Sequence, residues 1–139
     1  MSETTTIDIN AGLDRVWTEL IDITAWPKWS ASMTSVNRLD DGPLREGSRA
    51  RVKQPRMPSM TWTVTELADQ SSFVWAAKTP GVVTLGTHRI TANPDGSTHL
   101  VLGVEHSGQM SGLIGRMTGA RTRRYMALEA AALKAASEA

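Results

Sequence analysis

The sequence predicts an α+β fold in which about seven antiparallel strands pack against one long C-terminal helix. From Ser32 to Ser107, apolar and polar residues alternate with a period of two, and turn-forming residues interrupt the pattern. From Gly108 to Ala139 the period is close to 3.6 residues and proline is absent. A length of 139 residues corresponds to a single domain over residues 1–139. The C-terminal helix is the only element able to cover the apolar face of such a sheet.

The predicted helix would be about 45 Å long, which exceeds the diameter of a domain of this size, so we expect it to cross the sheet diagonally. Four glycines weaken its first half, and the firmer half is expected to begin near Ala120. The residues expected on its sheet-facing stripe are apolar or small: Met110, Leu113, Met117, Ala120, Leu128, Ala131, Ala132 and Ala135.

Two short helices are predicted after a first strand over Thr4 to Ile9. Asn10 is a plausible N-cap of the first helix, which carries an apolar face. The second helix, from Ile23 to Trp29, is expected to be interrupted by Pro27. Both helices are too short to form a bundle, so we expect them to close one end of the sheet.

Six further strands are expected over Met33–Leu39, Ser48–Lys53, Met60–Leu67, Ser72–Lys78, Val82–Ala92 and Thr98–Ser107. The last two form a hairpin around Asn93-Pro94-Asp95-Gly96, whose residues suit a type I turn followed by a left-handed glycine. This turn places Ile90 opposite Leu100 and His88 opposite Leu102.

An earlier hairpin is expected around Asp69-Gln70, with Ala68 paired to Ser71. That register puts Trp62, Val64, Phe73 and Trp75 on a buried face. It also makes Glu66 the one acidic residue expected on the inner face of the sheet, near a strand end where solvation is the simpler interpretation.

Composition excludes several classes of protein. The absence of cysteine excludes disulfides and thiolate chemistry, and the net charge of +1 argues against nucleic acid as a partner. No run of 18 apolar residues suggests a membrane span, and the N-terminus lacks the features of a signal peptide, so a cytoplasmic location is expected. We expect a monomer or a weak homodimer.

The three histidines do not predict a metal site. His99 and His106 point to opposite faces of one strand. In the predicted register His106 lies opposite Thr84, about 13 Å along the sheet from His88, which is too far for one shared ion. We therefore expect no metal and no cofactor. His88 and His106 are either half-buried, hydrogen-bonded residues or polar groups in the wall of a cavity.

Several short motifs occur in a characteristic order along nearly the whole chain. These are I-x-A, VW, LID and WPKW near the N-terminus, then G-x-L-x-E-G, W-x-V-x-E-L, F-x-W, H-x-I and GST-x-L, and finally a glycine-rich helix ending in LKAASE. Together they resemble the SRPBCC superfamily, which includes START and birch-pollen-allergen-type domains, and most closely its bacterial polyketide cyclase/dehydrase-like branch. The resemblance implies a helix-grip fold with a deep cavity between the sheet and the long helix.

The candidate cavity residues combine the inner face of the sheet, the tryptophans where the resemblance places the end of the cavity, and the arginines nearest the expected inward stripe of the helix. Tryptophan and methionine give such a pocket adaptable walls. An arginine at its edge could meet an anionic head group. The candidates are Trp26, Trp29, Met33, Trp62, Val64, Trp75, His88, Ile90, Leu102, His106, Met117, Arg121 and Arg124.

Two functions fit this reading. The favoured one is the binding or transport of a small hydrophobic or amphipathic molecule, such as a lipid, a polyketide-like aromatic or an isoprenoid. The alternative is an enzyme, namely a polyketide cyclase, aromatase or dehydratase, in which His88, His106 and Arg124 are the available acid–base groups. Binding is favoured because two histidines about 13 Å apart cannot share one proton transfer. A third reading, in which the protein acts through its surface on another protein, stays open.

Overall fold

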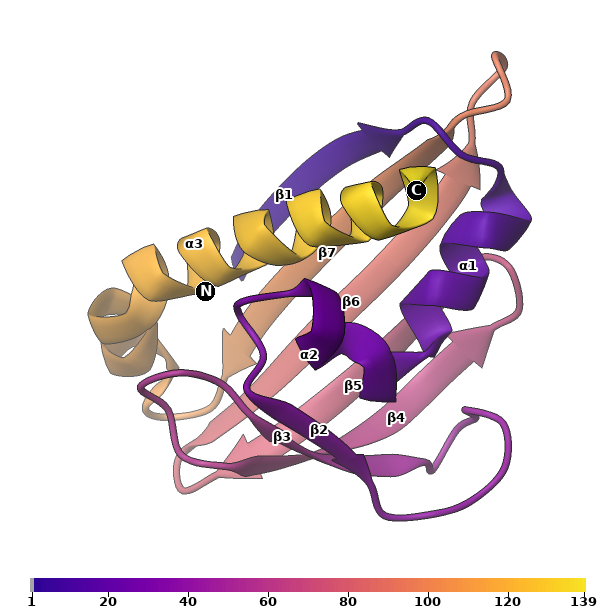
Figure 1. The fold of residues 1–139 in the computed structure, drawn as a ribbon. Helices are drawn as coiled ribbons and strands as arrows, with labels where there is room; N and C mark the ends of the chain where they lie inside the picture. Colours follow the sequence, from indigo (N-terminus) through magenta and orange to yellow (C-terminus); the bar gives the residue numbers. More distant parts are fainter. Residues whose placement is uncertain (1) are drawn as a thin grey trace.

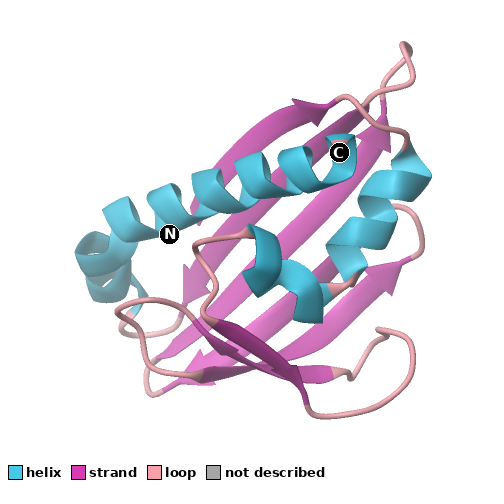
Figure 2. Ribbon diagram, in the orientation of Figure 1, coloured by secondary structure: helices cyan, strands magenta, loops and turns pink. Residues whose placement is uncertain are grey.

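The computed structural model describes residues 2–139, in which seven antiparallel strands form one curved sheet and all helices lie on one of its faces (Figures 1 and 2). The strand order is β1-β7-β6-β5-β4-β3-β2. This arrangement confirms the predicted α+β helix-grip fold. The strands are β1 (Ser2–Ile9), β2 (Ser35–Arg38), β3 (Arg49–Lys53), β4 (Met60–Ala68), β5 (Ser72–Thr79), β6 (Val82–Ala92) and β7 (Thr98–Ser107). The helices are α1 (Leu13–Ile21), the 3-10 turn η1 (Ile23–Ala25), α2 (Trp26–Trp29) and α3 (Ser111–Glu138).

The connectivity places α3 next to the sheet edge that β7 and β1 form. Strands β2 to β7 follow one another as a meander, and β1 pairs with β7 at the far edge of the sheet. Figure 1 shows α3 running obliquely across β1 and β7, with α1 and α2 covering the neighbouring part of the same face. The apolar face of the sheet is therefore shared between one long and two short helices, whereas the sequence had suggested α3 as its only cover.

The β6–β7 hairpin has the predicted register. Ile90 lies opposite Leu100, and His88 lies opposite Leu102. The backbone N–H of Asn93 donates to the carbonyl of Ser97 at 2.8 Å, and Gly96 has a φ of 89°, the left-handed conformation that the turn requires. Turn chemistry and hydrophobic alternation were therefore sufficient to predict this pairing.

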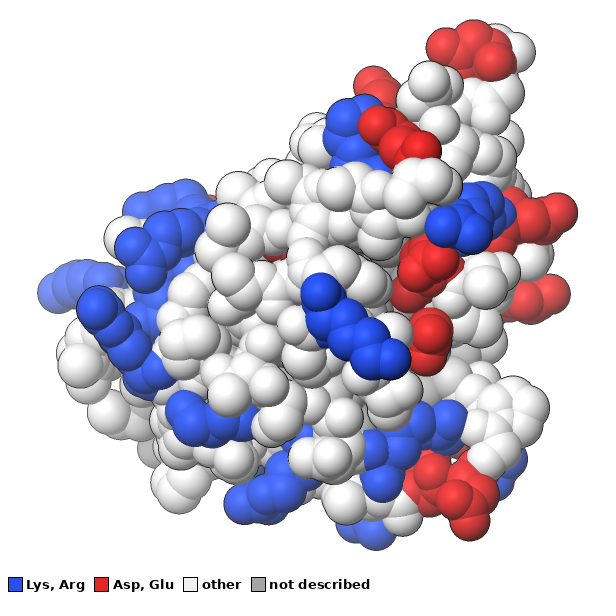
Figure 3. All heavy atoms as spheres, viewed as in Figure 1, with Lys and Arg blue, Asp and Glu red and all other residues white. Residues whose placement is uncertain are grey.

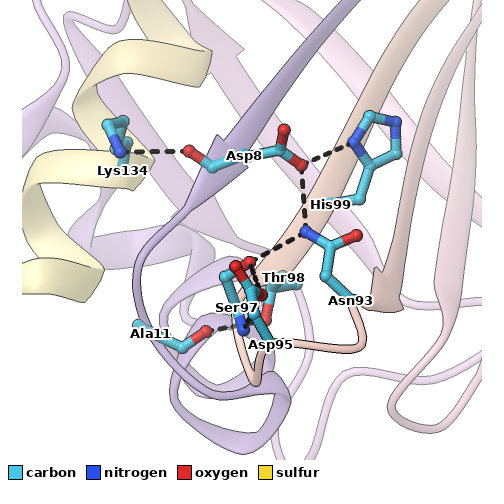
Figure 4. Close-up of polar contacts among 8 residues, drawn as sticks. All are labelled: Asp8, Ala11, Asn93, Asp95, Ser97, Thr98, His99 and Lys134. Carbon is cyan, nitrogen blue, oxygen red and sulfur yellow. Dashed lines mark hydrogen bonds and ion pairs between the residues drawn. The ribbon is translucent and has the colours of Figure 1, made fainter.

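A polar network ties this hairpin to β1 and α3 (Figure 4). One carboxylate oxygen of Asp8 lies 2.9 Å from Nδ1 of His99 and accepts a hydrogen bond from Asn93 Nδ2 at 3.0 Å. The backbone carbonyl of Asp8 accepts a bond from Lys134 Nζ at 3.0 Å. The hydrogen bond from His99 is the main reason that the pKa of Asp8 lies below its usual value. His99 thus connects β7 to β1 at the surface and takes no part in a cavity.

The β4–β5 hairpin differs from the prediction next to its turn. The turn contains three residues, so Ala68 pairs with Ser72, and Gln70 takes a φ of 61°. A β-bulge between Val64 and Glu66 absorbs the extra residue and restores the predicted pairing of Val64 with Trp75. Because of the bulge, Leu67 packs against the core and Glu66 is exposed, so the predicted inner-face position of Glu66 is wrong.

The short helices begin at other residues than predicted. Gly12 occupies the N-cap of α1, whereas the backbone N–H of Asn10 donates to Glu138 of α3 at 2.7 Å. The prediction of Asn10 as the cap is therefore wrong. Pro27 lies in the first turn of α2, where its missing N–H removes no helical hydrogen bond, so it begins the helix instead of interrupting it.

The face of α3 that meets the sheet is not the predicted one. Its buried residues are Gly115, Gly119, Tyr125, Met126, Ala130, Leu133 and Ser137. Most predicted positions lie two residues before a buried one, a rotation of about 200° around the helix. Leu113, Met117 and Leu128 are consequently 48%, 70% and 40% exposed. The buried side combines small residues, which allow the helix to approach the sheet closely, with Tyr125, Met126 and Leu133.

Candidate ligand-binding cavity

A cavity of about 190 Å³ lies between the sheet and α3. Strands β3 to β7 form its floor, α2 closes one side, and the first two-thirds of α3 cover it. The lining is mostly aromatic, aliphatic and methionine side chains, including Met33, Met57, Met60 and Met126. A concave, mostly apolar space of this kind is typical of small-molecule sites.

The aromatic part of the wall depends on one glycine. Trp75 lies 5.4 Å from Trp26 and 5.4 Å from Trp62 between ring centroids, so it connects α2 to β4. Gly86 on β6 lies opposite Trp75, and a Cβ at this position would stand only 2.8 Å from the Trp75 indole nitrogen. The absence of a side chain at Gly86 thus lets the indole of Trp75 lie close to the neighbouring strand.

Eight of the thirteen predicted cavity residues line this space: Trp26, Met33, Trp62, Trp75, His88, Leu102, His106 and Arg121. They come from α2, from the connection between α2 and β2, from the four strands β4 to β7 and from α3. The sheet residues among them were placed by strand alternation, which survives small errors of register.

The other five lie elsewhere. Val64 and Ile90 are each 2% exposed and belong to the packed core, since the elements covering that part of the sheet leave no space beside them. Trp29 borders a separate, smaller hollow. Met117 and Arg124 point to solvent because of the actual orientation of α3; the Arg124 guanidinium carbon stands 5.9 Å from the ring centroid of Tyr125. Their predicted positions in the cavity are wrong.

Glu129 on α3 is the acidic residue of the cavity wall, and the sequence analysis missed it. Burial raises the pKa of its carboxyl group from 4.5 to about 7, while a hydrogen bond with the Ser32 side chain acts in the opposite direction. At neutral pH this carboxyl is therefore present in both protonated and ionised forms. One feature of the sequence could have indicated a buried position: Glu129 is the one charged residue in the apolar segment from Tyr125 to Leu133.

His88 is the second polar group of the inner wall. Its ring stacks on Phe73 with centroids 4.0 Å apart, and its Nδ1 lies 3.2 Å from the carbonyl oxygen of Phe73. Since a carbonyl only accepts, Nδ1 carries the hydrogen and Nε2 is left as an acceptor. Burial lowers the pKa of His88 to about 4, so the imidazole is neutral at pH 7.

Glu129 and His88 border the same small hollow, which has a volume of about 10 Å³ and is also lined by Trp29 and Ser30. The Trp29 indole N–H is buried and has no hydrogen-bond partner within residues 2–139. The hydroxyls of Ser30 and Ser32 lie 2.7 Å apart nearby in the chain. A space of this size matches about one water molecule. The small hollow therefore combines a donor, an acceptor and a carboxyl group that can act as either.

Two further lining residues, Arg121 and Tyr125, connect α3 to the segment between β3 and β4. Arg121 Nη1 donates to the carbonyl of Arg56 at 3.3 Å, and the Tyr125 hydroxyl donates to the carbonyl of Pro55 at 2.5 Å. His106 lies opposite Thr84, as predicted, and partial burial lowers its pKa. Arg121 thus holds one edge of the cavity together.

Two further observations concern other classes of site. Across residues 2–139, no three histidine, aspartate or glutamate side chains gather closely enough to hold a metal ion. In the same part of the chain, no helix has the length and apolar character needed to cross a membrane.

The fold and cavity place the protein in a class of helix-grip domains that enclose an apolar space. Solved structures of the same architecture include the ZhuI aromatase/cyclase from Streptomyces sp. R1128, at 20% identity and a TM-score of 0.79 over 99% of this chain and 93% of that one. The di-domain aromatase/cyclase BexL of the BE-7585A biosynthetic pathway matches at 19% identity and a TM-score of 0.74, over 99% of this chain and 46% of that one. Ara h 8.0201 matches at 7% identity and a TM-score of 0.75, over 99% and 97%.

At these identities the similarity establishes the shared fold. The family follows from the sequence itself: residues 2–138 match the model of the family described as polyketide cyclase/dehydrase and lipid transport, and the chain belongs to that family. The predicted relationship to the SRPBCC superfamily is thereby confirmed. No curated protein matches the chain in sequence.

Proposed function

We propose that the protein binds one small apolar or amphipathic molecule in the cavity between the sheet and α3. The observation that carries this proposal is the 190 Å³ space between sheet and helix with its wall of tryptophan, methionine and leucine side chains. Burying a ligand against such a wall contributes about 25 cal/mol per Å² of apolar surface before the cost of association. Membership of a family that includes lipid transport supports the same function.

The polar groups narrow the chemistry of the ligand. Glu129 and His88 lie in the cavity wall; at neutral pH His88 is neutral and the Glu129 carboxyl is partly protonated. A hydroxyl, phenol or carbonyl group would satisfy them, whereas a permanently charged group would have to be desolvated there. We therefore propose a lipid, a polyketide-like aromatic or an isoprenoid whose inner end is neutral and forms hydrogen bonds.

Adding 2-naphthol is expected to shift the tryptophan emission of the wild-type protein with one binding site per chain, because Trp26, Trp62 and Trp75 line the cavity. Thr122→Phe, which puts a ring into the same space, is expected to weaken this binding at least about tenfold. Thr91→Phe, an exposed substitution on β6, is the matched control and should bind as the wild type does. Unchanged binding in Thr122→Phe would place the probe outside the cavity and refute the proposal.

A second function is favoured by one observation, the presence of Glu129 beside His88. The sequence indicated no acid–base pair, since His88 and His106 are too far apart, but the structure brings a carboxyl of pKa about 7 and a neutral imidazole to the same hollow. A carboxyl with this pKa suits general acid or base catalysis near neutral pH, as a cyclase, aromatase or dehydratase requires. Loss of turnover of a polyketide-like substrate in Glu129→Gln, with substrate binding retained, would establish this function.

The predicted cytoplasmic location, the bacterial origin, the lack of a nucleic-acid partner and the monomeric or weakly dimeric state stay predictions.

A further inference from the structure

We propose that the outward face of the first half of α3 docks onto the surface of an anionic lipid bilayer. The face contains Met110, Leu113 and Met117, here called the α3 apolar strip, whose exposed fractions are 43%, 48% and 70%. Spacings of three and four residues place these side chains in one line along the helix. This inference goes beyond ligand binding and does not depend on which molecule the cavity takes.

The apolar strip is unusual within this protein. Five large apolar side chains are exposed in the described chain, and four of them are Met110, Leu113, Met117 and Leu128, in or directly before α3. Scattered exposed apolar residues need no explanation, but a continuous line on one helix face marks an interaction surface. The close packing of the opposite face on the sheet prevents α3 from turning these residues inward.

Charge identifies the partner. Between Met110 and Arg124 the sequence contains Arg116, Arg121, Arg123 and Arg124 and no acidic residue. Arg123 pairs with Glu3 at 2.8 Å, whereas within residues 2–139 neither Arg116 nor Arg124 forms an ion pair. Figure 3 shows basic side chains gathered at the end of the molecule where α3 begins, while acidic side chains gather at the opposite end. The surface thus combines an apolar strip with neighbouring arginines of the same helix, of which Arg116 and Arg124 are exposed.

An anionic bilayer fits this combination better than a second copy of the chain. Two-fold contacts place the same surface of both subunits together, so the arginines beside the strip would face their own copies. At a bilayer surface, leucine and methionine enter the interfacial region, and the long arginine side chains reach the lipid phosphates. Each arginine near an anionic leaflet then adds to the attraction.

The position of the strip gives docking a consequence for the cavity. Ile114, Thr118 and Arg121 belong to the same half of α3 and line the cavity from its side. A bilayer that contacts the apolar strip would therefore lie next to the wall through which an apolar ligand could be exchanged.

The test is flotation of the full chain with vesicles, using equal parts of phosphatidylcholine and phosphatidylglycerol or phosphatidylcholine alone. The wild type is expected to float with the anionic vesicles, less at high salt, and to bind the zwitterionic vesicles at least about tenfold more weakly. Leu113→Ser with Met117→Ser should lower anionic binding at least about tenfold, whereas Leu39→Ser, at another exposed leucine, should not. Arg116→Glu with Arg124→Glu should also lower binding to the anionic vesicles at least about tenfold. Arg89→Glu, an exposed charge reversal on β6, is the control and should not lower it to this extent.

Three results would overturn the proposal. The first is no binding to anionic vesicles at low salt. The second is an equal loss of binding in Leu39→Ser or Arg89→Glu, which would show that no particular face is used. The third is a dimer in sedimentation velocity that the Leu113→Ser and Met117→Ser pair dissociates, which would assign the strip to a second copy of the chain. Thermal unfolding by circular dichroism confirms that each variant compared is folded.

Discussion

Leu133→Ala is expected to lower the free energy of unfolding by about 2–5 kcal/mol, whereas Leu128→Ala is expected to change it by less than about 1 kcal/mol. Leu133 is 2% exposed and belongs to the core cluster, so its loss leaves a cavity. Leu128, one and a half turns earlier on α3, is 40% exposed and points outward. Both substitutions shorten a leucine of α3 by the same atoms, but Leu133 lies on the face that packs on the sheet and Leu128 lies on the outer face.

Urea unfolding followed by circular dichroism measures both free energies. The pair tests the orientation of α3 directly, because the sequence pattern had placed Leu128 on the inward stripe. A larger loss of stability in Leu128→Ala than in Leu133→Ala would restore the predicted face and contradict the structure.

Glu129→Gln is expected to make the protein more stable than the wild type at pH 8, by on the order of 2–3 kcal/mol, and to leave stability nearly unchanged at pH 5. The pKa of Glu129 is about 7 in the folded protein and 4.5 when unperturbed. Between these values the folded state holds a proton that the unfolded state has lost. The contribution of Glu129 is therefore fully present below pH 4.5 and is lost as the pH rises through 7. Glutamine cannot ionise and escapes this loss.

His88 acts in the opposite direction. Its pKa is about 4 in the folded protein and 6.5 when unperturbed, so between these values the unfolded state holds the extra proton and stability rises with pH. In the wild type the two groups nearly cancel between pH 4.5 and 6.5. In Glu129→Gln the rise caused by His88 should become visible over this range.

Unfolding free energies of both proteins from pH 4.5 to 8 test this prediction. Comparing the two proteins removes the contribution of groups common to both, such as Asp8, Asp40, Asp95 and His106. Parallel curves for the wild type and Glu129→Gln would show that the carboxyl titrates normally, and the inference that burial keeps it partly protonated at neutral pH would be wrong.

The parts of the fold that the sequence predicted correctly are those set by local chemistry. Proline, aspartate and glycine at residues 94–96 determine the β6–β7 turn, and the alternation on both strands agrees with it, so the register could be derived residue by residue. The β4–β5 turn lacks such residues: Gln70 adopts a left-handed conformation that its sequence does not favour, and the compensating bulge at Thr65 depends on tertiary packing.

The orientation of α3 could not be predicted because apolar and small residues occur on both of its sides. Periodicity alone fits both sides: the predicted side carries Leu113, Met117 and Leu128, and the side that packs on the sheet carries Tyr125, Met126 and Leu133. This one error accounts for the wrong placement of Met117 and Arg124 and for the omission of Glu129. The sheet-borne candidates were less sensitive, since a strand has only two faces, although Val64 and Ile90 show that the correct face does not guarantee a place in the cavity.

The most direct test of the central proposal is native mass spectrometry of the freshly purified wild-type protein and of Thr122→Phe, before and after an apolar extract of the expression host is added. The wild type is predicted to carry one small molecule per chain, and Thr122→Phe is predicted to carry much less of it. Two results would contradict the proposal that the cavity between the sheet and α3 is a ligand-binding site. One is a wild-type protein that carries no bound molecule with or without the extract. The other is equal loading of the same molecule by the wild type and by Thr122→Phe.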